Sequence, residues 1–465
     1  MPQNNPARCL VLAACLSLGA CASQRYEARP LDAAAGARKL ETRSLSAPGL
    51  RSFIEARRPG QAWPPQQWNL ELLTLAAFHF NGELEAAGAR LAAAEAAVVT
   101  AGQRPNPVLQ LPFQRVLDPK DSESPWTLGL ALDIPLETKG KRGHRVAEAS
   151  HRAAAARLQL ASTAWRLRSR LREQLLALWT NTEKARLLEQ QVALDKSLAA
   201  MFDKRLREGY ASVRELQQQN LALIQSSREL LAALRTMQSA RIELARLLGL
   251  PPAGLDGVQL DMAAFVQADP PLPAPRLRSL ALLNRADVLA ALESYEASQA
   301  ALQLEVARQY PDLHLGPGYT FDQGVRKPGF DFSGIELPLF NRNEGPIAEA
   351  RARRQEAAAA VGLVQGKAWA ELDDGLAAYR TARDALREAD SLFRSQQARL
   401  AHTERAFGLG EEDSVALADQ RKASLAARLS LFEAEGLVQQ ALGRIEDAIQ
   451  RPLSAIDASE TDQQQ

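Results

Sequence analysis

Hydrophobic positions recur at every seventh residue along a stretch without proline between Pro346 and Pro452. A strict seven-residue period places these side chains on one seam of a helix that supercoils against a neighbouring helix. The pattern breaks at residues 408–413, and a second helical pattern begins at Ser414. The stretch therefore predicts a long helix, a tight turn and a returning helix, with a seam formed by Leu372, Tyr379, Leu386, Phe393, Leu400 and Phe407.

A similar helix is predicted for residues 141–206, where leucine, valine and alanine form the seam. At 1.5 Å per residue it would be about 100 Å long. No compact domain accommodates two helices of this length, so the sequence predicts a long bundle or a tube. A soluble coiled-coil spacer is the alternative.

Short alternating segments precede each long helix. Residues 108–117 and 126–136 are separated by a turn-rich segment and predict a β-hairpin, and residues 312–321 and 329–338 predict a second one. Four strands cannot close a barrel, and open strand edges are not tolerated in lipid. Several chains could together close one barrel, which suggests a membrane pore continued by a helical conduit.

The chain contains an internal duplication. Three short motifs recur in the same order at offsets of 204, 203 and 201 residues: Pro107-Val-Leu-Gln-Leu111 with Pro311-Asp-Leu-His-Leu315, Asp133-Ile-Pro-Leu136 with Glu336-Leu-Pro-Leu339, and Leu206-Arg-Glu-Gly209 with Phe407-Gly-Leu-Gly410. A nearly constant offset is what a duplicated unit would give.

The N-terminus resembles a bacterial export signal. Arg8 is followed by an apolar region, residues 9–18, that is too short to span a bilayer. The region ends at Leu18-Gly-Ala-Cys21, which resembles a lipobox and implies that Cys21 is acylated and that the protein is sorted to the outer membrane. An ordinary signal peptide with a chance cysteine is the alternative. No cysteine follows Cys21, so the mature chain has no disulfide.

These patterns predict an organisation in successive segments. A signal peptide (1–20) is followed by a loop-like, lipid-anchored tether (21–67). The first repeat (68–248) contains a helix, a hairpin (108–136), a long helix, a tip (207–213) and a return helix, and a linker (249–275) follows it. The second repeat (276–450) contains a helix, a hairpin (312–338), a long helix, a tip (408–413) and a return helix, and the chain ends in a disordered tail (451–465).

Composition excludes several functional classes. The net charge of +1 gives no argument for nucleic-acid binding. There is no nucleophile elbow, phosphate loop or paired-carboxylate site, so we expect no catalytic residues and no cofactor. We also expect no metal site, because no metal-ligand spacing relates the histidines His79, His144, His151, His314 and His402.

The chain resembles the TolC-type outer-membrane channel family over nearly its whole mature length. The match is carried by Asp133-Ile-Pro-Leu-Glu137, Glu336-Leu-Pro-Leu-Phe340, the paired glycines Gly209 and Gly410, and Arg285-Ala-Asp-Val288. The resemblance implies a mainly α fold with a small β part: a homotrimeric α-helical tunnel in the periplasm, continued by a 12-stranded β-barrel with four strands from each chain. It also implies partners, namely a periplasmic membrane-fusion adaptor, an inner-membrane pump of the RND type and outer-membrane lipid, with passive passage of substrate.

Residues 139–143 and 337–345 resemble the branch that serves heavy-metal cation pumps, the CzcC-like proteins. The expected function is therefore passive exit of heavy-metal cations through the outer membrane. Drug efflux and type I secretion use the same kind of channel and remain open. A structural envelope lipoprotein with coiled-coil rods is an alternative of a different class, although it does not explain the strands.

By the same resemblance, the tips are expected to contact the adaptor. Helix reversal alone would also explain a glycine at a helix end and a polar cap before the next helix, and both roles can coexist. The expected contact residues are Gly209, Ser212, Val213, Leu216, Gly410, Ser414, Val415 and Leu417.

Negative charge is concentrated at the second tip. Repeated in three chains, it would form an acidic ring that favours cations at a narrow entrance. The alternative is the ordinary preference for acidic residues at a helix N-terminus. The acidic residues of the expected ring are Glu411, Glu412, Asp413 and Asp419. Gln218 is the first-repeat counterpart of Asp419, so a ring at that position would have three carboxylates rather than six.

Overall fold

The computed structural model describes residues 25–117, 124–266, 272–332 and 336–456. The chain divides into two units, Met1–Arg43 and Ser44–Gln465. The described part of the first unit contains α2 (Ala33–Glu41), which begins at a cap where Asp32 accepts hydrogen bonds from the backbone N–H groups of Ala34 and Ala35. Cys21 and the predicted export signal lie outside the described residues.

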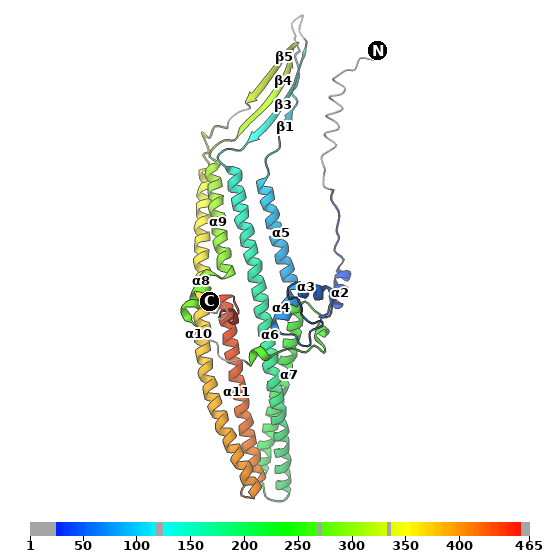
Figure 1. The fold of residues 1–465 in the computed structure, drawn as a ribbon, viewed down its shortest axis with the longest axis vertical. Helices are drawn as coiled ribbons and strands as arrows, with labels where there is room; N and C mark the ends of the chain where they lie inside the picture. The colour runs from blue at the N-terminus through cyan, green and yellow to red at the C-terminus, as the bar shows by residue number, and fades with distance from the viewer. Residues whose placement is uncertain (1–24, 118–123, 267–271, 333–335, 457–465) are drawn as a thin grey trace. The chain divides into compact units, whose positions relative to one another are not determined.

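Two very long helices organise the second unit (Figure 1). They are α6 (Lys141–Arg207), of 67 residues, and α10 (Glu344–Leu409), of 66 residues. Each is about 100 Å long at 1.5 Å per residue. Each is followed by a shorter helix that returns antiparallel to it, α7 (Val213–Leu248) and α11 (Ser414–Ile449).

The four helices of the tip half form one row in the order α10, α11, α6, α7 (Figure 1). In the half nearer the sheet, α5 (Gly82–Gly102) and α9 (Ala286–Ala307) pack beside α6, and α9 also packs against α10. α6 therefore contacts helices of both repeats along its length. Of the helices in the described ranges, none combines the length and apolar composition that a membrane span needs.

One antiparallel sheet lies beyond the helices. Its strands are β1 (Val108–Gln110), β2 (Phe113–Arg115), β3 (Trp126–Leu136), β4 (Leu313–Asp322) and β5 (Val325–Phe332), in the order β1-β3-β4-β5 with β2 also on β3. Pro112 separates β1 from β2, and its backbone oxygen accepts a hydrogen bond of 2.8 Å from Gly129 N. β1 and β2 thus form one interrupted ribbon, and the pairing of β3 with β4 joins the two repeats.

The last strand lies earlier in the chain than predicted. The sequence placed it at residues 329–338, whereas β5 spans Val325–Phe332 and residues 336–340 belong to no strand. The reason is the turn after β4: Gln323 and Gly324 both have positive φ, +50° and +100°, which makes a two-residue hairpin. Pairing therefore begins at once, with Asp322 opposite Val325.

The helix predicted at the start of each repeat is divided in two. α4 (Leu70–Phe80) ends at Asn81, whose side chain caps α5 and donates a hydrogen bond of 2.9 Å to the backbone oxygen of Leu247. α8 (Ala274–Leu283) ends at Asn284, and α9 begins after Arg285. A polar side chain that satisfies backbone groups at a helix end offers an alternative to continuing the helix.

Part of the predicted tether and part of the predicted disordered tail are packed. In α3 (Pro48–Glu55), Leu50 and Ile54 are buried in a core shared with α4, α6, α7 and the 3-10 turns η1 (Pro252–Leu255) and η2 (Ala263–Phe265). Leu453 and Ile456 are buried in a second core with α8, α10 and α11. These segments are mainly polar in composition, but their few apolar residues are buried. Each repeat has its own core about midway along its long helix.

Candidate functional site: the paired helical tips

The first tip reverses the chain between α6 and α7. Gly209 has φ +81°, a left-handed conformation that glycine adopts without strain. The backbone N–H of Tyr210 donates to Arg205 O at 2.8 Å, which closes the end of α6. Ser212 and Glu215 form a reciprocal capping box at the start of α7. The backbone N–H and hydroxyl of Ser212 hold the pKa of the Glu215 carboxyl below its usual range.

The second tip has the same design with different residues. Gly410 has φ +78°, and the N–H of Glu411 donates to Ala406 O at 2.9 Å. Asp413 caps α11, where its Oδ1 accepts hydrogen bonds from two backbone N–H groups of the first turn. The N–H of Ala416 and then the guanidinium of Arg205 lower the pKa of Asp413. Both tips are thus sharp turns with a polar cap on the return helix.

The structure brings the two tips together. Arg205 at the end of α6 donates to Asp413 Oδ2 at 2.8 Å. Beside this ion pair, Ser414 Oγ lies 3.4 Å from Met201 Sδ. An apolar cluster joins the same helices through the buried Leu198, Phe202 and Ala418 and the half-buried Leu194, Ala211, Leu216 and Val415. No pattern along the chain indicated this pairing, because Arg205 and Asp413 are 208 residues apart.

The expected contact residues differ in how accessible they are. Gly209, Ser212, Val213 and Gly410 are exposed, and Val213 has 58% of its surface accessible. Leu417 is only 7% exposed, so its burial favours a packing role over contact with another protein. The remaining three are half-buried: Leu216 and Val415 in the apolar cluster, and Ser414 beside Met201.

The acidic residues at the second tip have different surroundings. The charge of Asp413 is used by the α11 cap and by Arg205. Glu411, Glu412 and Asp419 are exposed, and the structure records no ion pair for them within the described part of the chain. They are the carboxylates of this group that remain available to solvent or to a cation.

Above the tips lies a buried ion pair between the repeats. Lys422 Nζ on α11 donates to Asp195 Oδ1 on α6 at 2.6 Å. Asp195 is fully buried, and its Oδ2 is the one buried side-chain oxygen in the described residues without a hydrogen-bond partner. Neither residue was singled out from the sequence, because a charge on a heptad helix is usually exposed.

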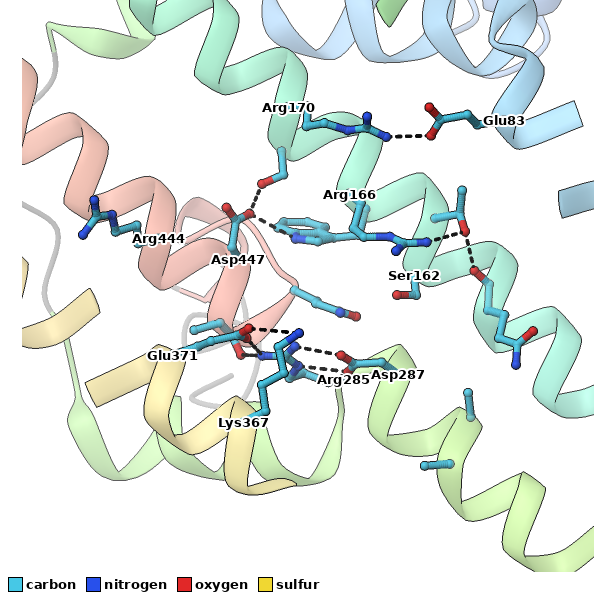
Figure 2. Close-up of a pocket in the computed structure, with 18 of the residues that line it drawn as sticks. Glu83, Ser162, Arg166, Arg170, Arg285, Asp287, Lys367, Glu371, Arg444 and Asp447 are labelled. Carbon is cyan, nitrogen blue, oxygen red and sulfur yellow. Dashed lines mark hydrogen bonds and ion pairs between the residues drawn. The ribbon is translucent and has the colours of Figure 1, made fainter. Parts of the chain in front are cut away.

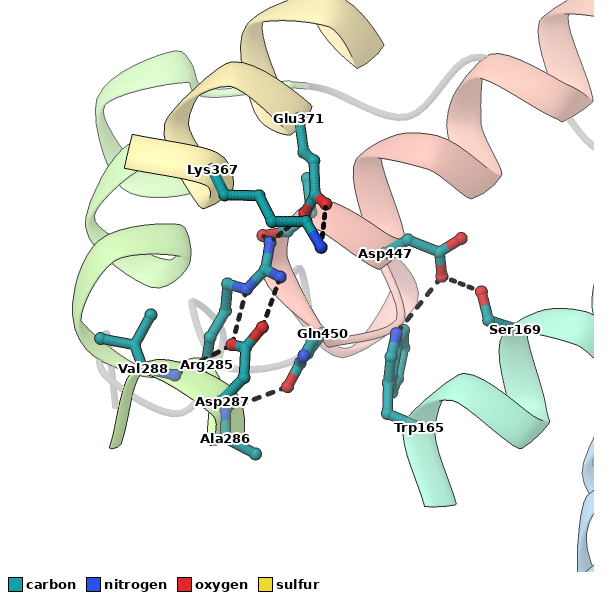
Figure 3. A network of polar contacts seen from close by, with 11 residues as sticks. Trp165, Ser169, Arg285, Ala286, Asp287, Val288, Lys367, Glu371, Asp447 and Gln450 are labelled. Atoms are coloured by element: carbon teal, nitrogen blue, oxygen red, sulfur yellow. Dashed lines mark hydrogen bonds and ion pairs between the residues drawn. The ribbon is translucent and has the colours of Figure 1, made fainter. Parts of the chain in front are cut away.

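A pocket of about 1150 Å³ lies midway along the helices, between α5, α6, α9, α10 and α11 (Figure 2). Arg285 is 4% exposed and pairs with Asp287 at 2.7 Å and with Glu371 at 2.6 Å. It also donates to Ala448 O at 3.0 Å, so it joins the start of α9 to α10 and to the end of α11 (Figure 3). The segment noted at 285–288 is thus a structural clamp.

Asp447 lies at the edge of the same pocket (Figure 3). It accepts a hydrogen bond of 3.3 Å from the indole N–H of Trp165 and another from the hydroxyl of Ser169. Burial raises the pKa of Asp447. These two hydrogen bonds join α11 to α6 and so link the two repeats, whereas the ion pairs on this wall, such as Glu83 with Arg170 and Asp374 with Arg444, each lie within one repeat.

Two of the histidines, His151 and His314, pair with carboxylates. His151 Nδ1 lies 2.8 Å from Glu293 Oε2, and His314 Nδ1 lies 3.1 Å from Asp133 Oδ1. Both pairs join the first repeat to the second. Across the residues that the structure describes, no group of three or more potential metal ligands occurs.

A duplicated chain with two very long helices, paired tips and a small sheet has the architecture of an outer-membrane efflux channel. The model of the outer membrane efflux protein family matches residues 77–250 and 277–449, once in each repeat, and the chain belongs to this family. This confirms the predicted mainly α, TolC-type fold with a small sheet part. It also confirms that the chain is not an enzyme, since the family consists of channels.

Two similar proteins are named for different substrates, metal cations and a pyoverdine. The chain is 27% identical over 293 residues, 63% of its length and 68% of the other chain, to the cobalt-zinc-cadmium resistance protein CzcC of Cupriavidus metallidurans. It is 25% identical over 421 residues, 82% of its length and 89% of the other, to the pyoverdine export outer membrane protein OpmQ of Pseudomonas putida. The fold matches the outer membrane protein VceC of Vibrio cholerae with a TM-score of 0.67 at 20% identity, covering 83% of this chain and 96% of VceC.

Proposed function

We propose that this protein is the outer-membrane exit duct of a tripartite efflux system that exports heavy-metal cations. The observation that carries the proposal is the pairing of the two tips through Arg205 and Asp413 at one end of rods about 100 Å long, with a small sheet at the other end. This arrangement provides a docking end and a membrane end that are separated by the length of the long helices.

The duct forms when three chains assemble. Each chain supplies a sheet with two open edges, β1 with β2 on one side and β5 on the other. Open edges are not tolerated in lipid, so three sheets join into one closed barrel of twelve ribbons. Acylation of Cys21 after removal of the export signal anchors each chain in the outer membrane, and the helices extend into the periplasm.

The tips bind a periplasmic adaptor, which couples the duct to an inner-membrane pump of the RND type. The exposed residues at the turns, Gly209, Ser212, Val213 and Gly410, make the contact. The contact surface is supported by the half-buried side chains of Leu216, Ser414 and Val415. The buried Leu417 packs inside the tip. The acidic ring at the entrance attracts cations. Its exposed carboxylates are those of Glu411, Glu412 and Asp419, and Asp413, which caps α11, also belongs to it.

Similarity to a cobalt-zinc-cadmium resistance protein supports metal cations as the cargo. Similarity to a pyoverdine export protein supports a second candidate, export of an organic siderophore, and so keeps the wider class of small organic substrates open. The family match covers both repeats and so gives no support to a non-channel envelope spacer. Neither of the two relatives named above supports type I secretion.

Growth of a deletion strain in zinc, cobalt and cadmium tests the proposal. The wild-type gene should restore resistance to at least one of these metals. Val213→Asp, at the exposed first tip, should abolish the restored resistance while trimers still form in the outer membrane. The matched control is Val266→Asp, because Val266 is 74% exposed and far from the tip in the sequence. Full resistance with Val213→Asp would contradict adaptor contact there, and unaltered metal tolerance of the deletion strain would contradict the cargo.

A further inference from the structure

The pocket midway along the helices contains charges that its ion pairs do not use (Figure 2). Cationic and acidic side chains line it in equal number. Most of them are paired: Arg170 with Glu83, Arg285 with Asp287 and Glu371, Lys367 with Glu371, and Arg444 with Asp374. Arg90 and Arg166 are exposed, and the structure records no ion pair for either within its described residues. Both guanidinium groups are therefore available to a ligand.

Arg90 and Arg166 lie on neighbouring helices at nearly the same level. Two ion pairs join α5 to α6 and show that the helices run antiparallel, Glu83–Arg170 at 2.6 Å and Glu95–Arg157 at 2.8 Å. Arg90 is seven residues beyond Glu83, and Thr163 is seven residues before Arg170, so Arg90 is level with Thr163. Arg166 is one turn from Thr163, a rise of about 4.5 Å. The two cations therefore lie on one wall of the pocket.

Two hydroxyl groups belong to the same wall. Ser162 and Thr163 are half-buried and line the pocket, and the Arg166 side chain extends along α6 toward Ser162 (Figure 2). Arg166 Nη2 donates to Thr163 Oγ1 at 3.1 Å, and Thr163 Oγ1 donates to Gln159 O at 2.8 Å. These bonds orient the guanidinium group and leave most of its N–H donors free. A planar guanidinium matches the two oxygens of a carboxylate or phosphate group.

The carboxylates of the lining are engaged or distant. Asp447 accepts hydrogen bonds from Trp165 and Ser169. Glu173 is exposed, and no ion pair is recorded for it in the described ranges, but it is seven residues from Arg166, about 10 Å along α6. The wall around Arg90 and Arg166 is therefore the positive end of a pocket whose other charges are largely neutralised.

We propose that this pocket binds an organic anion, whose carboxylate or phosphate group is held between Arg90 and Arg166 and by the hydroxyls of Ser162 and Thr163. A volume of about 1150 Å³ suits a drug-sized molecule rather than a single inorganic ion. Small side chains of α9 and α10 leave room for the body of the ligand: Ala290, Ala291, Ala357 and Ala360. Because one chain supplies every one of these residues, the inference goes beyond the proposed function and depends neither on assembly nor on the cargo.

Calorimetric titration of the purified full-length protein with citrate and with inorganic phosphate, in metal-free buffer, tests the site. Citrate should bind, and more tightly than phosphate. Arg90→Gln and Arg166→Gln should each weaken citrate binding by roughly 10-fold, because each removes charge-assisted hydrogen bonds to the anion. Arg166→Lys keeps the charge but lacks the planar fork, so it should restore only part of the affinity. The melting temperature of each variant should match that of the wild type, since both side chains are exposed.

Arg186→Gln is the matched control. Arg186 is on the same helix, 53% exposed, and 20 residues from Arg166, about 30 Å along α6. It should leave citrate binding unchanged. Equal weakening by Arg186→Gln, or no binding of citrate at millimolar concentration, would overturn the site. Phosphate binding as tight as that of citrate would overturn the organic ligand. Growth of the deletion strain in metals tests the proposed function separately, so the two failures are distinguishable.

Discussion

Replacing Lys422 with methionine should loosen the contact between the two repeats just above the tips. The substitution removes the cation 2.6 Å from Asp195 Oδ1 and leaves a fully buried carboxylate whose Oδ2 already lacks a partner. Removing one member of a buried pair costs about 3–5 kcal/mol. The Lys422 side chain is 31% exposed, so the lower end, about 3 kcal/mol, is the appropriate figure here.

Hydrogen exchange of the backbone amides in α6 and α11 around this pair measures the change. A loss of about 3 kcal/mol corresponds to roughly a 100-fold increase in local opening. Asp195→Leu combined with Lys422→Met should recover most of the protection, because an apolar pair of similar size can replace a buried ion pair without a large cost.

Lys184→Met is the matched control for this prediction. Lys184 pairs with Glu433 at 2.6 Å between the same two helices, but their side chains are 36% and 50% exposed. Loss of an exposed pair should cost at most about 1 kcal/mol, roughly a fivefold change in exchange. Equal effects of Lys184→Met and Lys422→Met, or a double variant as poorly protected as Lys422→Met alone, would refute the reasoning.

Further predictions concern the clamp, one close backbone approach and the second tip. Arg285→Met should lower the free energy of unfolding by about 3 kcal/mol and so lower the melting temperature, since two carboxylates lose their buried cation; an unchanged melting curve would contradict the clamp. Gly249→Ala should lower the free energy of unfolding by more than about 1 kcal/mol, because φ is +70° and the added Cβ would lie 2.7 Å from Phe80 O; thermal melting measures this, and a neutral result would contradict the close approach. The pKa of Asp413 is lowered by the N–H of Ala416, so its stabilisation is complete above the ordinary pKa of 3.8 and is lost as pH falls through the lowered value. The protection of the backbone N–H groups of Val415 and Ala416 against hydrogen exchange should fall in that acid range but stay constant from pH 5 upward, whereas Asp413→Asn should remove the dependence.

Local patterns predicted much of the fold. The seven-residue seam through Leu372 and Tyr379 predicted a continuous helix, and both residues are buried on α10. Gly209 and Gly410 marked the two helix ends, where each has positive φ. Such features depend on neighbours a few residues away, so the sequence displays them directly. The same is true of the duplication, because a copied unit repeats its own local signals.

Other features were decided only by the tertiary structure. The register of β5 followed from the two-residue turn at Gln323 rather than from the alternation after Phe332. Alternation shows which side chains can share a face but not which strand pairs with which.

The contacts that join the repeats were likewise absent from the sequence pattern. Arg205 with Asp413 and Asp195 with Lys422 unite residues more than 200 positions apart. The sequence by itself determined the rods, the turns and the duplication, because their signals are periodic and local. Only the folded chain decided which charges meet, because an ion pair depends on the order in which distant helices pack, and that order leaves no period in the sequence.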